Sequence, residues 1–364
     1  MSMHWNARNS SAHLPSLPEE LWSKIIELTH DVPSDFISRL KLLSFHASLT
    51  STLPVINMLP VILVCKMWYR LALPFLYKDM VLTDSSELQG AAETVALRPF
   101  GHHTTRLVLH MRPDLDDLYS LLLHLSNIEI VIIDYGHESD YSYGTMLSER
   151  ILALPRLRLL CGPNFLGLMS TPTCPTLRAM TFPLRVDKPV PDQDSQQDPL
   201  PLFPNLSQLY FAYNISLSTI KYVTPDMRRD FQSVTSILIG YDYKESYLDL
   251  ILCISGYLPN LRYIGIQTTF QDCFCEWGPF RNPAPIPSGV HTLGLSFRRE
   301  KIWSPRIFKM LCQGLEHIHG YGLKVIRIDE DTILHIKSQP SIAERVHEIF
   351  QTKKWKLEVG DMYV

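Results

Sequence analysis

Cysteine and histidine residues near position 280 could together bind a metal ion. Cys273 and Cys275 flank Phe274 and precede His291, and thiolate and imidazole groups are the ligands that zinc prefers. Structural zinc sites use ligand pairs two to four residues apart and a second such pair, which this chain lacks. We therefore expect the two cysteines to be loop thiols, and we expect no resident metal.

Two groups of histidines have residue types suited to acid–base chemistry or to metal binding. His102 and His103 are adjacent and precede His110, and His317 lies two residues before His319. Histidine serves in both roles because its pKa lies near neutral pH. We favour surface or turn histidines for both groups, with a catalytic or metal-binding set as the alternative.

Glycine-containing segments likewise fall short of known catalytic and phosphate-binding motifs. Gly320-Tyr321-Gly322 lacks the third glycine of a dinucleotide-binding loop, and no Gly-x-x-x-x-Gly-Lys-Ser/Thr run is present. The segment Gly294–Arg298 contains Ser296 but lacks the second glycine of a nucleophile elbow. The sequence therefore predicts no bound cofactor and no enzymatic activity.

The composition indicates an intracellular globular protein. The 364 residues are 46% hydrophobic and 20% charged, enough to form a large core in about two domains. The net charge of −3 gives no basic excess, so we expect neither nucleic-acid nor membrane binding. Seven scattered cysteines, an odd number, are typical of reduced thiols. We expect the protein in the cytoplasm, the nucleus or both.

The chain also lacks segments that would direct it into a membrane. Residues 1–13 show no basic-then-apolar signal pattern, and we expect a disordered tail there. The most apolar runs, 53–64 and 118–133, are interrupted by proline or polar residues. A membrane helix needs about 20 consecutive apolar residues, so we predict none.

A repeated spacing of apolar residues organises the chain beyond residue 100. An anchor residue is followed at the third and fifth positions by further apolar residues, and successive anchors lie 20 to 33 residues apart. Nine short strands at this period predict a solenoid, in which each repeat buries its face against its neighbours. The anchors are Thr104, Ile128, Leu157, Leu177, Leu206, Val234, Leu261, Val290 and Leu323.

Helix signals lie between several of these strands, and this alternation predicts parallel strands. Asp114 and Ser304-Pro305 are suited to open two of the helices. The expected helices span 115–126, 145–154, 246–257, 304–318 and 341–350, and residues 355–359 are expected to form a last strand. We expect loops at 187–201 and 278–289, and a solvated strand end at Asp329–Asp331.

The N-terminal part before the repeats is expected to be helical. Amphipathic spacing predicts helices at 19–30, 36–49 and 61–72, with a break at 31–35 and the last helix ending before Pro74.

Two motif halves within this part resemble those of an F-box. The first half contains Leu17-Pro18, Glu20-Leu21, Ile25-Ile26 and Leu28, and the second contains Val64-Cys65-Lys66, Trp68 and Leu71-Ala72. Pro74–Tyr77 is similar to the continuation found in fungal F-box-like proteins. The halves are separated by an insert at 31–60, where most F-boxes have about ten residues.

This resemblance implies a domain order and a partner. An F-box-like helical unit would span 14–82, and the repeats, which resemble degenerate leucine-rich repeats, would form a curved α/β solenoid over 83–364. F-box proteins bind the S-phase kinase-associated adaptor of SCF-type E3 ubiquitin ligases, and their C-terminal domain holds a protein substrate. The residues expected to contact the adaptor are Leu17, Pro18, Leu21, Ile25, Val64, Cys65 and Trp68.

Two alternatives remain open at this point. The apolar residues of the helical unit could instead form only the core of a cap over the first repeat, and the protein would then be a repeat-based interaction scaffold without a ubiquitin-ligase role. Aromatic residues after the strands are expected on one solenoid edge, either as a substrate-binding surface or packed beneath their own loops. The proposed substrate-binding residues are Tyr141, Tyr213, Tyr243, Phe274 and Trp277.

Overall fold

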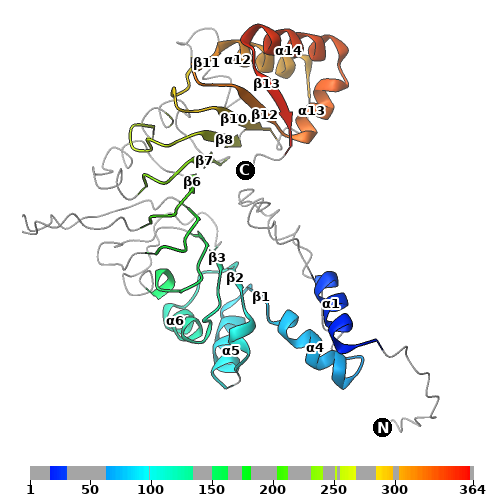
Figure 1. Ribbon diagram of the computed structural model, residues 1–364, viewed down its shortest axis with the longest axis vertical. Coiled ribbons are helices and arrows are strands. Elements are labelled where there is room, and N and C mark those ends of the chain that lie inside the picture. Colours follow the sequence, from blue (N-terminus) through cyan, green and yellow to red (C-terminus); the bar gives the residue numbers. More distant parts are fainter. Residues whose placement is uncertain are drawn as a thin grey trace, which may run out of the picture.

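One long, curved sheet of eleven parallel strands organises the protein (Figure 1). The computed structural model describes residues 17–30, 63–97, 99–133, 150–162, 174–181, 203–211, 231–240, 251, 255–267, 284–297 and 303–360. Within these ranges the strands follow one another in sequence order, and every paired neighbour runs parallel. The chain therefore forms the predicted α/β solenoid.

All nine strands expected from the apolar spacing are present, and two more extend the sheet at its ends. The strands are β1 (Asp79–Leu82), β2 (Arg106–Leu109), β3 (Ile130–Ile133), β4 (Leu159–Cys161), β5 (Ala179–Thr181), β6 (Gln208–Phe211), β7 (Ser236–Ile239), β8 (Tyr263–Gln267), β10 (Thr292–Ser296), β12 (Val325–Ile328) and β13 (Lys356–Val359). Strand β13 is the expected closing strand. Strand β1 pairs with β2, so the sheet begins at Asp79, before residue 83.

Side chains alternate between the two faces of this sheet, as the two-residue period of a strand requires. One face forms the main core, where residues such as Leu209, Ile237 and Ile264 lie in register and are buried. The eight apolar anchor residues, all except Thr104, join this core from the segments just before the strands. Because each repeat covers its neighbour's apolar face, the core is continuous from the first repeat to the last.

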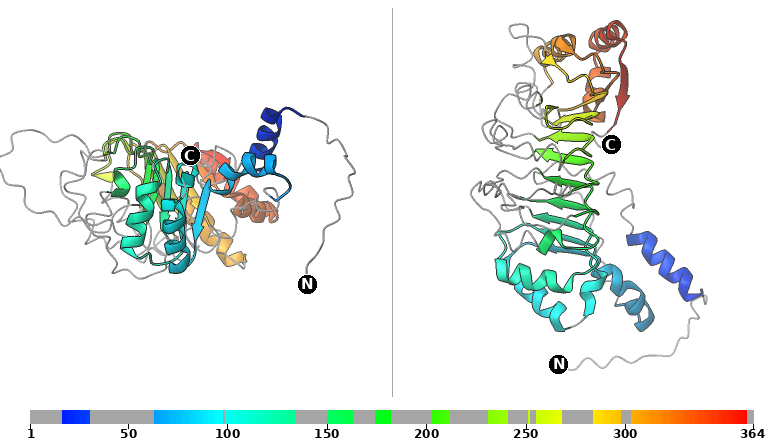
Figure 2. Two further views of the ribbon diagram at one scale, coloured as in Figure 1. Left: turned by 90° about the horizontal axis from the view of Figure 1, so that it is seen from below. Right: turned by 60° about the vertical axis from the view of Figure 1, so that its left-hand side comes forward.

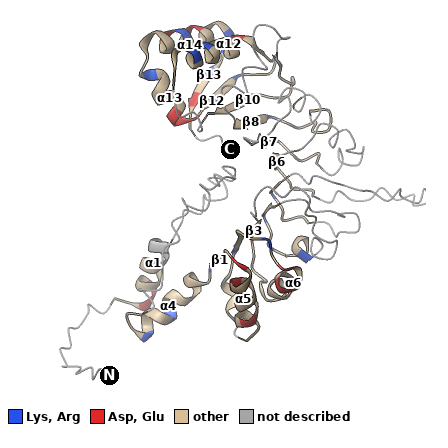
Figure 3. Ribbon diagram, turned by 180° about the vertical axis from the view of Figure 1, so that it is seen from behind, with Lys and Arg blue, Asp and Glu red and all other residues tan. Residues whose placement is uncertain are grey.

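Helices cover the two ends of the solenoid, as Figures 1 and 2 show. At the first end lie α5 (Ser85–Leu97), the 3-10 helix η2 (Pro99–His103) and α6 (Leu115–His124); at the last end lie α12 (Pro305–His317), α13 (Glu330–Lys337) and α14 (Pro340–Lys353). Acidic residues occupy the first turns of α5, α6 and α13, where they complement the positive ends of the helix dipoles (Figure 3).

The capping predictions for two helices are confirmed. The Asp114 carboxylate accepts hydrogen bonds from the backbone N–H groups of Asp116 and Asp117, and α6 begins at the next residue. The Ser304 hydroxyl accepts from the N–H of Ile307 at the start of α12, with Pro305 in the first helical position. The expected closing helix is α14.

Two local predictions are wrong, and one helix was not predicted. Asp329 does not end a solvated strand; it is buried and caps α13, because its carboxylate accepts from the N–H of Thr332. Residues 284–285, expected in a loop, form β9 (Ala284–Pro285), which pairs with β11 (Ile318–His319). Helix α5 was not expected, since its small residues form only a weak apolar stripe.

The third N-terminal helix also differs from its predicted bounds. It is α4 (Lys66–Leu76), which begins after Cys65 and continues through Pro74. Proline costs a helix one internal hydrogen bond, and the helix is retained here because Phe75 and Leu76 pack beyond it against the small core of the helical unit. Residues 150–154 of the expected helix 145–154 are described; 150–152 are helical, and 153–154 are not.

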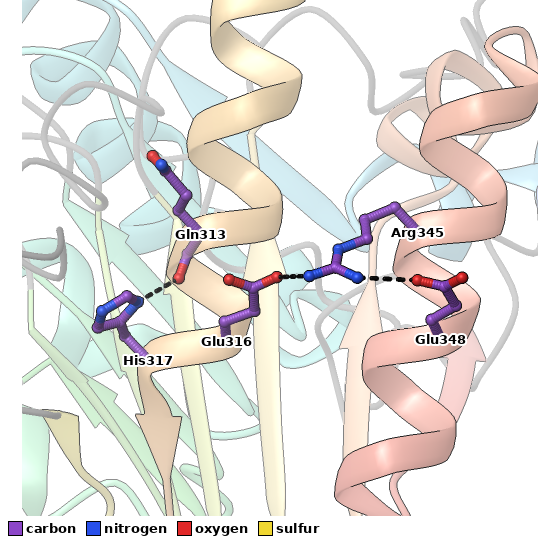
Figure 4. A network of polar contacts seen from close by, with 5 residues as sticks. All are labelled: Gln313, Glu316, His317, Arg345 and Glu348. Atoms are coloured by element: carbon purple, nitrogen blue, oxygen red, sulfur yellow. Dashed lines mark hydrogen bonds and ion pairs between the residues drawn. The ribbon is translucent and has the colours of Figure 1, made fainter.

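A charged network joins the last helices on the surface (Figure 4). The Arg345 guanidinium on α14 lies between two carboxylates, 2.6 Å from Glu316 Oε1 on α12 and 2.8 Å from Glu348 Oε2 on its own helix. These exposed pairs align α12 with α14, although exposed ion pairs add little to stability.

The helical unit is joined to the solenoid without a long linker. The unit consists of α1 (Glu19–His30) and α4, and only Tyr77 and Lys78 separate α4 from β1. The Tyr77 ring stacks on Phe100 of η2, with ring centroids 4.7 Å apart and an interplanar angle of 17°. Figures 1 and 2 show the unit projecting from the first end of the sheet. The stacking fixes the base of α4 against the first repeat.

Candidate partner-docking surface

Helix α1 begins directly after the Leu-Pro pair of the first motif half. The Pro18 carbonyl accepts hydrogen bonds from the N–H groups of Leu21 and Trp22, at 3.0 and 3.2 Å. Glu19 and Glu20 occupy the first turn, where negative charge is favoured. The motif therefore defines the start of the helix as well as part of its surface.

Apolar residues form two different stripes along α1. Trp22 and Ile26 face α4: the Trp22 ring packs on Trp68, with centroids 5.1 Å apart, and Ile26 is only 2% exposed. Leu17, Leu21 and Ile25, spaced four residues apart on another side, are 38%, 49% and 41% exposed. The helix thus uses one stripe for its own packing and leaves the other uncovered.

The second motif half supplies the start of α4 and further exposed apolar residues. The Cys65 sulfur accepts from the N–H of Trp68 at 3.5 Å and so caps the helix. Val64, just before this cap, is 56% exposed. Trp68 is half-buried because one side of its ring contacts Trp22. Cys65 and Trp68 therefore have structural roles in addition to the partner contact predicted for them.

An ion pair connects the two helices beside these apolar residues. The Arg70 guanidinium of α4 lies 2.5 Å from Glu19 Oε2 of α1, and both side chains are largely exposed. Behind it, Ile26 and Ala72 are buried together with the partly buried residues Leu71 and Phe75. The outer stripe of α1 takes no part in this small core.

We call the seven predicted contact residues the docking face: Leu17, Pro18, Leu21, Ile25, Val64, Cys65 and Trp68. Six are exposed and Trp68 is half-buried. Two further apolar side chains beside them, Leu63 and Tyr69, are also exposed and were not singled out from the motif. Helical spacing could have identified Tyr69, because Tyr69 lies four residues after Cys65 and therefore on the same side of the helix.

The face has the physical character of an interaction surface. Full burial of one leucine or isoleucine side chain stabilises by about 1.5–3 kcal/mol. Four such aliphatic side chains, each about half exposed, therefore offer roughly 3–6 kcal/mol to a partner that covers them. Exposed apolar patches larger than a few hundred Å² are uncommon on monomeric proteins.

The proposed substrate-binding residues lie outside the part of the chain that the structure describes. These are Tyr141, Tyr213, Tyr243, Phe274 and Trp277. The same is true of the insert at 31–60 and of the Cys273–Cys275 pair. The substrate-binding and insert hypotheses therefore remain predictions.

The histidine groups have local contacts. The rings of His102 and His103 lie 3.7 Å apart, and burial together with His102 lowers the pKa of His103. His319 Nδ1 lies 3.3 Å from Lys353 Nζ, and burial, Lys353 and His317 lower the pKa of His319. Among the described residues, no three His, Cys, Asp or Glu side chains are placed to hold a metal ion together.

Within the described ranges, no helix combines the length and the apolar character needed to cross a bilayer.

Comparison with known proteins gives no functional assignment. No protein-family model matches the sequence, and no curated protein matches it. Among solved structures, the leucine-rich repeat-containing protein LegL7 from Legionella pneumophila is similar, with 14% sequence identity and a TM-score of 0.39. The similarity covers 74% of this chain and 90% of LegL7. At these values it supports no transfer of function, and the repeat fold of this chain is defined by its own strand pairing.

Proposed function

We propose that this chain is a non-catalytic, repeat-based interaction scaffold that acts as a substrate-recognition adaptor of an SCF-type E3 ubiquitin ligase. The helical unit docks on the S-phase kinase-associated adaptor of the ligase, and the solenoid holds a protein substrate.

One observation carries the adaptor proposal. Helix α1 packs on α4 through Trp22 and Ile26, yet it leaves Leu17, Leu21 and Ile25 uncovered. A cap that served only the solenoid would gain stability by burying those side chains. Their exposure, in a motif that resembles an F-box, supports a surface kept for a partner.

Co-purification with the ligase adaptor tests the proposal. Leu21→Asp combined with Ile25→Asp places two charges on the docking face and alters no buried residue. We expect the adaptor to bind the double variant roughly 30-fold more weakly, the scale of hot-spot contacts of about 2 kcal/mol. Circular dichroism and the thermal midpoint are expected to match those of the original protein.

A matched control lies at the other end of the molecule. Leu334 on α13 is 59% exposed, and Leu334→Asp adds a charge to an apolar surface position outside the docking face. This variant is expected to bind the adaptor normally. Equal weakening by both changes, or no binding to the original chain, would contradict the proposal.

The second candidate is an interaction scaffold with no ubiquitin-ligase role. The stacking of Tyr77 on Phe100 favours it, because this contact joins the helical unit to the first repeat as an end cap would be joined. Under this alternative the purified chain retains its other partners and never recovers the ligase adaptor.

A further inference from the structure

A row of core residues ends on an exposed side chain at β13, the last strand of the sheet (Figure 1). The row is formed by residues that lie in register on neighbouring strands: Leu209, Ile237, Ile264, Leu293, Ile326 and Leu357. The first five are no more than 2% exposed, whereas Leu357 is 38% exposed. Val359 pairs in register with the buried Ile328 and is 51% exposed. The last strand therefore carries core-facing side chains that remain open to solvent.

The first strand of the same sheet is covered by the chain itself. Leu82 of β1 is 7% exposed, and it belongs to the main core together with Leu88 and Val95 of α5. Helix α5 contacts β1 directly. The exposure at β13 is thus a property of the last end of the solenoid and not of both ends.

The backbone of β13 also has an edge available for pairing. Among the described strands, β12 alone pairs with β13. The N–H groups of Lys356 and Gly360 donate to carbonyls of the β12 repeat. Since alternate residues of a strand direct their backbone groups to alternate sides, those of Leu357 and Val359 point away from β12. Such an edge is a template for a further strand.

Two opposite charges lie on the other face of β13. Lys356 and Glu358 are two residues apart, and Lys356 Nζ lies 3.0 Å from Glu358 Oε1. A lone lysine on an edge strand opposes pairing through its charge. Here the order lysine, leucine, glutamate is complementary to itself, because the reversed order places each lysine opposite a glutamate. A second copy of this chain therefore supplies the matching strand.

We propose that two copies of this chain pair through β13, antiparallel, about a two-fold axis at Leu357. An axis perpendicular to the sheet keeps both apolar faces on the same side. Each Leu357 then stands opposite Leu357 of the second copy, and the two residues exchange two backbone hydrogen bonds. The core row continues from one copy into the other. On the opposite face, Glu358 lies between Arg327, 2.9 Å away in its own chain, and Lys356 of the second copy.

Backbone direction and charge together select this register. Residues with outward-pointing backbone groups must face one another, so the axis passes through a residue and not between two residues. An axis at Glu358 would place two glutamates opposite each other, and an axis at Lys356 two lysines, which is unfavourable. An axis at Val359 would place Glu358 opposite Gly360, with no ion pair. An axis at Leu357 gives two Lys356–Glu358 pairs.

The small contact predicts a reversible dimer. Stable interfaces bury about 800 Å² on each partner, and a pair of four-residue strands is a small contact by comparison. We therefore expect a monomer–dimer equilibrium that depends on concentration. The proposal goes beyond adaptor docking and does not depend on it, because β13 and the docking face lie on different elements at different ends of the chain.

Sedimentation equilibrium of the full chain over a series of concentrations tests the proposal. The weight-average mass is expected to rise from 41.9 kDa towards twice that value. Lys356→Glu and Glu358→Lys each replace two attractive cross-strand pairs by repulsive ones, so each variant alone is expected to associate at least about tenfold more weakly. An equimolar mixture of the two is expected to recover association, because unlike charges then face each other. A variant that failed to fold would not be rescued by mixing.

A backbone variant separates strand pairing from a contact made by charges alone. Leu357→Pro removes an N–H that points away from β12, and proline is tolerated at such positions of edge strands. Circular dichroism is expected to show a retained fold, while self-association is lost. The control is Leu97→Asp, at a position of α5 that is 84% exposed, and this variant is expected to associate like the original chain.

Three results would overturn the proposal. The original chain could stay monomeric at every concentration, which would leave the edge to a strand of a different protein. The mass could grow beyond that of a dimer, which would indicate head-to-tail assembly through β1. The mixed charge variants could fail to recover association, which would exclude the pairing of Lys356 with Glu358.

Discussion

The solenoid and the helical unit use the same kinds of apolar residues in opposite ways. In the solenoid, aliphatic residues at the anchor positions are almost completely buried. In the helical unit, Leu21 and Ile25 have an equally regular spacing but remain about half exposed. An apolar pattern therefore predicts a core only where a neighbouring element is present to cover it.

The number of neighbours explains this difference. Each inner strand has a strand on both sides and shares its apolar face with both. Among the described elements, the main packing partner of α1 is α4, against which α1 buries one stripe. The other stripe, with Leu21 and Ile25, stays exposed.

The largest expected effect contrasts a solenoid leucine with a leucine of the docking face. Leu206→Ala removes a fully buried anchor, so we expect the free energy of unfolding to fall by about 3–4 kcal/mol. Leu21→Ala removes a half-exposed side chain, so a change within about 0.5 kcal/mol is expected. Urea denaturation followed by circular dichroism measures both. Equal losses would show that the docking face belongs to a core.

A smaller effect is expected from two helix caps that differ in burial. The Asp329 carboxylate accepts from the N–H of Phe297 and of Thr332, so it connects the end of β10 to α13. Asp329→Ala leaves two buried N–H groups unpaired, and we expect a loss of about 2–3 kcal/mol.

Asp114→Ala is the control, because Asp114 is an exposed cap that serves only its own helix. A loss of about 1 kcal/mol is expected from it in the same denaturation experiment. If the two changes cost the same, the link between β10 and α13 contributes nothing beyond capping.

The smallest expected effect concerns two thiols and depends on pH. Burial raises the pKa of Cys161 to about 12, whereas Cys65 on the docking face is exposed. At about pH 8, iodoacetamide is expected to modify Cys65 and spare Cys161, because the thiolate is the nucleophile. Mass spectrometry of the peptides measures both sites.

The raised pKa of Cys161 also makes the stability of the fold depend on pH. The unfolded thiol loses its proton near pH 8.5, and the folded one keeps it to about pH 12. The contribution of Cys161 is therefore fully present below pH 8.5 and is lost progressively as the pH rises towards 12. Rapid alkylation of Cys161 in the folded protein would mean that this part of the sheet opens.

Sequence reasoning succeeded where one physical constraint repeats. Anchors such as Leu177 and Val290 predict strands because each unit must bury the same face at nearly the same interval. The parallel direction of the strands was predicted from the helices expected between them, because parallel strands need such crossover connections. The docking-face residues were also named from their motif. Whether they are exposed or form the core of a cap was left open, because that depends on which surfaces the chain itself covers.

Other features depended on contacts distant in the sequence or on weak local signals. Asp329 looks like a surface acid until its contact with Phe297, 32 residues earlier, is known. The start of helix α5 does carry a sequence signal, a capping-box arrangement of Asp84 and Glu87. The Asp84 carboxylate accepts a hydrogen bond from the Glu87 N–H, and the Glu87 carboxylate accepts one from the Thr83 N–H.

The short connection between α4 and β1 has a geometric consequence. Because two residues and a ring stack join the helical unit to the first strand, the distance of each repeat from the docking face is set by the position of that repeat along the sheet. Neighbouring strands lie about 4.8 Å apart, so the ten intervals of the eleven-stranded sheet span about 48 Å along its curve. Adding or removing one repeat would therefore change the distance between the docking face and the last strand by one such interval.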